Sequence, residues 1–84
     1  MQSALTSVSK DPSESLETLA RAAITAALTN KWLDAAKLNE KILTQDNANV
    51  EALNRLARAH LCLGQLQKAE KTYKKVIELD PYNN

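Results

Sequence analysis

The sequence repeats itself with a period of 34 residues. When residues 16–49 are laid over residues 50–83 without a gap, nine aligned positions are identical. These pairs are Glu17/Glu51, Leu19/Leu53, Arg21/Arg55, Ala23/Ala57, Ala35/Ala69, Lys37/Lys71, Lys41/Lys75, Asp46/Asp80 and Asn49/Asn83. Periods of roughly 20 to 50 residues are typical of repeat arrays, in which each unit buries its apolar face against the next unit. We therefore expect a short array of two equivalent units.

Each unit contains two stretches in which apolar residues recur at helical spacing. The first residues of the four stretches are Leu16, Trp32, Val50 and Leu66. One glycine and two prolines among 84 residues are too few for the turns of a sheet protein. The sequence therefore predicts an all-α fold without strands. The four antiparallel helices are expected near residues 12–29, 32–45, 50–63 and 66–79.

The first predicted helix is preceded by residues typical of a helix start. Asp11 is placed as the N-cap, Pro12 as the first helical residue, and Glu14 three residues after the cap. We expect the polar residues 1–10 to be a flexible tail. The domain then covers residues 11–84, with the two repeats at 16–49 and 50–83.

The residue types at three pairs of equivalent positions support this alignment. Asn30 and Gly64 occupy the same place in the two units, and both residue types tolerate the left-handed backbone that often ends a helix. Alanine recurs at Ala23/Ala57 and at Ala35/Ala69, which is expected where two helices approach closely. We predict a helix end at both Asn30 and Gly64.

The second unit closely resembles a tetratricopeptide repeat. The family pattern of apolar, small and aromatic positions followed by proline matches a set of residues in this unit, namely Leu53, Leu56, Ala57, His60, Ala69, Tyr73 and Pro81. The first unit is a weaker match, because Asn47 stands where the family favours proline. The resemblance implies a right-handed α-α superhelix of two helix-turn-helix repeats, a solenoid that serves as a protein-binding scaffold.

Composition and motifs argue against several other functions. The net charge of +1 gives no electrostatic basis for binding nucleic acid or an acidic membrane. His60 and Cys62 lie two residues apart, so on a helix their side chains diverge and cannot share a metal or form a catalytic pair. We interpret His60 as a structural residue, partly buried between helices. We expect no enzymatic activity, cofactor or metal, and a cytoplasmic location, to which the single cysteine is suited.

By resemblance to tetratricopeptide proteins, the concave surface is lined by the first helix of each repeat and binds an extended or helical peptide. The residues expected to face this peptide are Glu17, Ala20, Ile24, Ala27, Leu28, Glu51, Asn54, Arg58, Leu61 and Cys62. Asn54 and Arg58 lie one turn apart and are candidates to hold a peptide carboxylate or backbone. The alternative is that these two residues are ordinary surface residues.

The end of the last helix suggests a second function class. Arrays usually need about three repeats, so Tyr73, Val76 and Ile77 are expected to be partly bare in this chain. Either the chain is a piece of a longer protein, or this patch pairs with a partner or a second copy. The alternative function is therefore a structural self-assembly module, with weak homodimerisation through the last helix.

Overall fold

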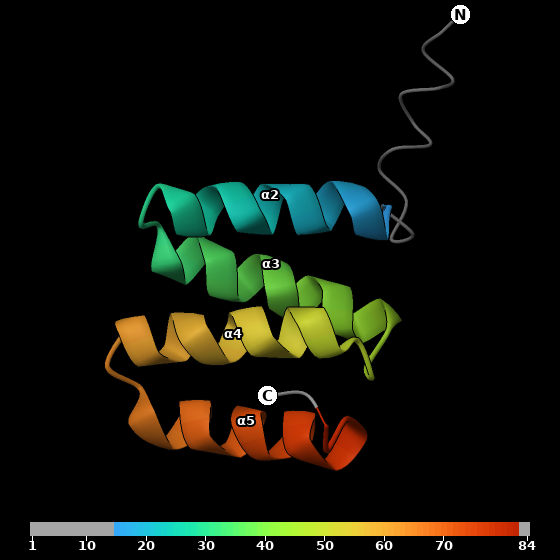
Figure 1. The fold of residues 1–84 in the computed structure, drawn as a ribbon. Helices are drawn as coiled ribbons and strands as arrows, with labels where there is room; N and C mark the ends of the chain where they lie inside the picture. Colours follow the sequence, from blue (N-terminus) through green and yellow to red (C-terminus); the bar gives the residue numbers. More distant parts are fainter. Residues whose placement is uncertain (1–14, 83–84) are drawn as a thin grey trace, which may run out of the picture.

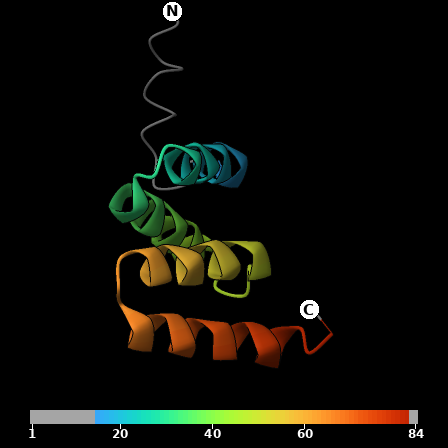
Figure 2. The same cartoon turned by 60° about the vertical axis from the view of Figure 1, so that its left-hand side comes forward.

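The structure is a computed structural model that describes residues 15–82, and within this range it contains four helices and no strand. The helices are α2 (Leu16–Leu28), α3 (Trp32–Gln45), α4 (Val50–Cys62) and α5 (Leu66–Leu79). Consecutive helices run antiparallel, with α3 between α2 and α4 and with α5 on the far side of α4 (Figures 1 and 2). The prediction of an all-α fold made of two helical hairpins is confirmed.

The start of α2 differs from the prediction. Ser15 has a non-helical ψ of 133°, and its side chain accepts a hydrogen bond from the backbone amide of Thr18 at 3.4 Å. Ser15 is therefore the N-cap, and the predicted helix start at Pro12 was wrong. Asp11, Pro12 and Glu14, together with the predicted tail, lie outside the described residues. Asn49 caps α4 in the same way, accepting a hydrogen bond from the amide of Ala52 at 3.0 Å.

The hairpin turns of the two repeats have the same geometry. Asn30 (φ 62°) and Gly64 (φ 78°) both adopt the left-handed conformation. The backbone amide of the following residue then donates to a carbonyl five residues earlier, Lys31 to Ala26 at 2.7 Å and Gln65 to His60 at 2.8 Å. This bond satisfies a carbonyl that the helix end would otherwise leave without a partner. The predicted helix ends at Asn30 and Gly64 are confirmed.

This geometry predicts unequal costs for two substitutions. A Cβ added at Gly64 would meet no heavy atom within 4 Å, so only the backbone conformation opposes a larger residue. We expect Gly64→Val to lower the free energy of unfolding by about 1–2 kcal/mol. Asn30→Gly should be nearly neutral, because glycine adopts the same φ without strain. Urea denaturation of both variants tests this expectation, and equal losses would contradict it.

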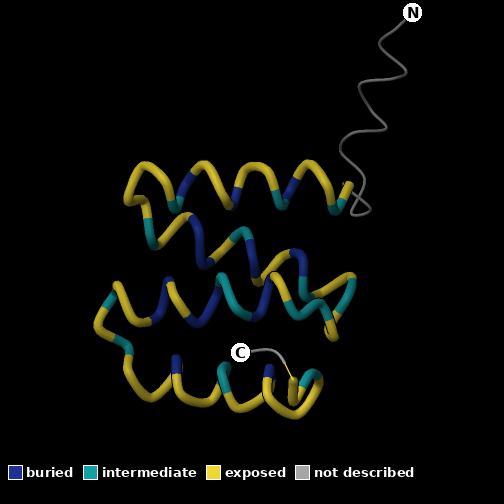
Figure 3. Tube along the Cα trace, viewed as in Figure 1, coloured by how far each residue is buried: buried dark blue, intermediate teal, exposed yellow. Residues whose placement is uncertain are grey.

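The core lies between successive helices, as the buried stretches in Figure 3 show. The four alanines predicted at the close helix contacts, Ala23, Ala35, Ala57 and Ala69, are all buried. Larger apolar side chains fill the space beside them, among them Leu19 and Ile42, which form a cluster with Ala52 of α4. Small and large side chains thus alternate, as close helix packing requires.

A polar contact joins the two repeats. Asn39 of α3 is buried; its amide nitrogen donates to the carbonyl of Ala35 at 2.9 Å. Its side-chain oxygen accepts a hydrogen bond from Nε of Arg55 on α4 at 3.0 Å. The buried amide is therefore satisfied on both sides, which avoids the desolvation cost of an unpaired polar group. This contact fixes the position of α4 on α3.

Candidate functional site

The residues predicted to face a peptide on α2 form one stripe along the helix. Ala20, Ile24 and Leu28 follow each other at four-residue spacing, which places them on the same face. Leu28 is 78% exposed and Ile24 is also exposed, whereas Ala20 is half-buried. Glu17 begins the stripe and forms an exposed ion pair with Arg21 at 3.1 Å. Such surface pairs contribute little stability, so the stripe is mainly apolar and accessible.

The predicted residues on α4 form a second and more polar stripe. Glu51 and Arg58 are exposed, Asn54 is half-buried, and Leu61 ends the stripe as an exposed apolar side chain. Asn54 and Arg58 lie one turn apart on the same face of α4. Two groups that can hydrogen-bond a carboxylate or a peptide backbone therefore lie next to each other.

Core residues connect the two stripes. Ala20 packs against the cluster of Leu19, Ile42 and Ala52, which contains residues of α2, α3 and α4. Ala27 packs in the same way against the cluster that includes Leu56 and Ala59 of α4. Both stripes therefore lie on helices that pack around one shared core. Packed helices hold binding side chains more precisely than a loop does.

His60 and Cys62 are not brought together. His60 is buried, and its Nδ1 lies 2.8 Å from the side-chain oxygen of Gln65 in the following turn. Cys62 is exposed at the end of α4. The structural role predicted for His60 is confirmed, since its side chain is buried and contacts Gln65 in the turn that follows α4. No three potential metal-ligating side chains of residues 15–82 gather at one point.

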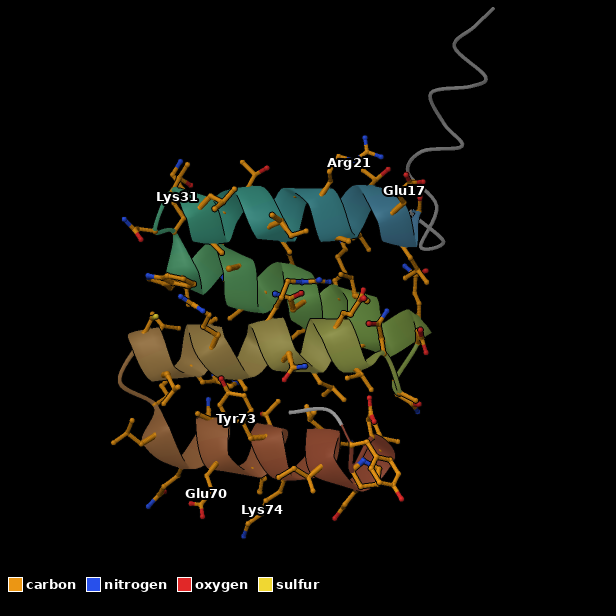
Figure 4. All side chains as sticks on the ribbon, viewed as in Figure 1. Glu17, Arg21, Lys31, Glu70, Tyr73 and Lys74 are labelled. Carbon is orange, nitrogen blue, oxygen red and sulfur yellow. The ribbon has the colours of Figure 1, made fainter. Side chains whose placement is uncertain are left out.

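The predicted self-association patch on α5 is smaller than expected. Val76 is only 4% exposed, so the expectation that it is partly bare was wrong. It faces the core of its own hairpin, at the position that Ile42 holds in the first repeat. Tyr73 is half-buried and points toward α4, whereas Glu70 and Lys74 point away from α4 (Figure 4). Ile77, at 58% exposure, is the member of the patch that solvent reaches most easily.

A groove that the sequence reasoning missed lies along α2 and α3. Its volume is about 690 Å³, and its walls include Ala22 and Thr25 of α2, Thr29 just after α2, and Leu38 of α3. Arg21 also lines it and projects from α2 on the side away from α3 and α4 (Figure 4). Ala22 stands where the second repeat has Leu56. This loss of side-chain volume is the one signal in the sequence that points to the groove.

Comparison with protein families adds one finding. Residues 50–83 match the family model described as Tetratricopeptide repeat. The match covers the second repeat as the internal period defines it, and the four helices of the structure have the expected arrangement. Together they support a tetratricopeptide repeat assignment for the second repeat. None of the helices in the described range is long and apolar enough to cross a membrane.

Proposed function

Because residues 50–83 form a tetratricopeptide repeat, we propose that this protein is a non-catalytic interaction module that binds a peptide or protein segment along α2 and α4. Repeats of this family typically bind proteins or peptides. The proposed surface consists of Glu17, Ala20, Ile24 and Leu28 on α2 and Glu51, Asn54, Arg58 and Leu61 on α4. The module needs no cofactor, and we place its action in the cytoplasm.

The observation that carries this proposal is the chemical difference between the two stripes. Ile24 and Leu28 are 44% and 78% exposed on α2, so part of their apolar surface is open to a ligand. Asn54 and Arg58 supply hydrogen-bond donors on α4. A peptide with apolar side chains near one end and a carboxylate near the other would satisfy both stripes. Apolar anchors provide affinity, and the polar groups fix orientation.

The proposal predicts that Arg58→Glu weakens binding of a peptide that ends in acidic residues and a free carboxylate. Loss of a charge-assisted hydrogen bond should reduce the affinity by about 10- to 100-fold, roughly 1–3 kcal/mol. Because Arg58 is exposed, the thermal unfolding midpoint should stay near that of the unchanged protein. Isothermal titration with such peptides, paired with thermal denaturation, measures both quantities.

Lys71→Glu is the matched control, since it reverses an exposed charge on α5, away from the proposed surface. This variant should bind the same peptide with unchanged affinity. Chemical-shift mapping of the complex should place the ligand at Ile24, Leu28, Asn54 and Arg58. Shifts concentrated at residues 68–75 instead would assign the binding site to α5 and refute the proposal.

Self-assembly through α5 remains the second candidate function, favoured by the exposure of Ile77. The burial of Val76 leaves a smaller apolar surface than the self-assembly proposal first assumed. Weak association is what such a small area supports, since forming a dimer costs about 4–15 kcal/mol of translational and rotational freedom.

A further inference from the structure

The groove lies on the face of α2 that is equivalent to the α3-facing side of α4. On α4 this side includes Leu56 and Ala59, which are buried in one cluster with Ala36 of α3. One period earlier lie Ala22 and Thr25 of α2, which are exposed and line the groove. The surface that α4 covers with α3 is therefore open on α2 within the described range.

The α5 helix, at the opposite end of the stack (Figure 1), carries the other half of the same contact. Ala36 and Leu43 of α3 pack against clusters that include residues of α4. One period later these positions are Glu70 and Ile77 of α5, which are exposed. Leu66, also exposed, extends their face by one turn. One chain thus exposes, at its two ends, both halves of the contact that joins its own repeats.

The side chains of the two exposed surfaces complement each other in size. Glu70 is larger than its equivalent Ala36 on α3, and Ala22 is smaller than its equivalent Leu56 on α4. The groove has a volume of about 690 Å³, so it has room for a longer side chain than that of Ala36. The volume that α2 lacks is therefore present on α5.

The charges at the centre of the two surfaces are opposite. Arg21 lines the groove and points away from α3 and α4, and Glu70 points away from α4 (Figure 4). In the contact between the repeats, the equivalent arginine, Arg55, donates to Asn39, one turn from the position equivalent to Glu70. A second copy packed in the same way brings Glu70 close to Arg21, where a charge-assisted hydrogen bond can form. Their present partners on α2 and α5 are exposed, and such pairs contribute little stability.

The lysines of α5 do not oppose this packing. They occupy positions at which α3 is exposed, although α3 lies between α2 and α4. The equivalent pairs are Lys68/Asp34, Lys71/Lys37, Lys74/Glu40 and Lys75/Lys41. The lysines therefore stay at the solvent side when α5 is covered. Lys37 and Lys71 already lie one period apart on neighbouring repeats of one chain, and the net charge of +1 gives little repulsion between copies.

We propose that copies of this chain associate head to tail, with α5 of one copy in the groove on α2 and α3 of the next. Leu66 and Ile77 supply the apolar contacts, and Glu70 pairs with Arg21. The contact is heterologous, so a dimer still exposes one surface of each kind and can add further copies. The proposal rests on the self-assembly candidate and identifies the surface that α5 meets. It is independent of peptide binding along α2 and α4.

The test is a pair of charge reversals, measured by sedimentation equilibrium over a range of concentrations. Arg21→Glu and Glu70→Arg each place like charges in the contact, and each should weaken association by about tenfold or more. An equimolar mixture of the two variants should associate nearly as strongly as the unchanged protein. In the mixture, every contact between unlike copies again joins opposite charges. Such a rescue also shows that both variants are folded.

Two matched controls make the same substitutions elsewhere. Glu78→Arg changes α5 at the position equivalent to the exposed Thr44, and Arg58→Glu changes the proposed peptide surface on α4. Neither should alter the association. Arg58→Glu should weaken peptide binding, whereas Arg21→Glu should leave it nearly unchanged. The failure of either proposal can therefore be recognised separately.

Three results would overturn the head-to-tail proposal. The first is a protein that stays monomeric at millimolar concentration, which also eliminates the self-assembly candidate. The second is an association that Glu70→Arg weakens and Arg21→Glu does not, because it indicates a symmetric contact between two α5 helices. The third is a mixture that associates no more strongly than either variant alone.

Discussion

Leu19→Ala is expected to remove a large part of the protein's free energy of unfolding. Leu19 is 1% exposed and forms one cluster with Ile42 and Ala52, so it links α2 with α3 and α4. Truncation of such a leucine costs about 3–5 kcal/mol, from lost apolar burial and from the cavity left behind. A domain of this size has a net stability of roughly 4–12 kcal/mol, at about 0.05–0.15 kcal/mol per residue. One substitution therefore removes a large part of the total.

Leu28→Ala is the matched control for this prediction. It removes the same atoms from the same helix, but Leu28 is 78% exposed, so the expected loss is within about 0.5 kcal/mol. Circular dichroism during urea denaturation measures both variants. A small loss for Leu19→Ala would mean that α2 is not anchored to the core through this residue.

Much of the fold can be predicted from the sequence because the two repeats have equivalent positions, so that a feature of one repeat predicts the same feature in the other. Asn30 and Gly64 differ in identity, yet their equivalent positions and shared backbone tolerance predict both helix ends. The start of α2 was predicted wrongly because two helix-start signals compete in this region. Asp11 and Pro12 have the composition of a cap, but Ser15 makes the hydrogen bond. Its equivalence to Asn49, which also caps a helix, could have resolved the choice.

The candidate site could be predicted only in part. Positions on the exposed stripes follow from helical spacing, so Ile24, Leu28 and Arg58 lie on the surface as expected. The groove on α2 and α3 depends on the volume between two helices, which spacing within one helix does not give. The bond between Arg55 and Asn39 is also a tertiary contact. It could be predicted only after the packing of α4 on α3 was known.

Val76 and Ile77 illustrate the limit of a pattern of apolar residues. They are adjacent and similar in size, so the sequence groups them, but neighbours on a helix point about 100° apart. Val76 is buried at 4% exposure and Ile77 is 58% exposed. Val76→Lys should therefore lower the free energy of unfolding by about 2–4 kcal/mol, because it places a charge in the core without a partner. Ile77→Lys should cost less than about 0.5 kcal/mol.

Ile77→Lys also tests the self-assembly candidate. If α5 mediates weak dimerisation, sedimentation of the unchanged protein should show self-association at high concentration, and Ile77→Lys should abolish it by placing a charge on the exposed patch. Val76→Lys cannot separate the two roles, since it disrupts the hairpin itself. A protein that stays monomeric at millimolar concentration would eliminate assembly through α5. If Val76→Lys and Ile77→Lys lowered the free energy of unfolding equally, the two side chains would have to be equally buried. That result would contradict the difference in burial between Val76 and Ile77.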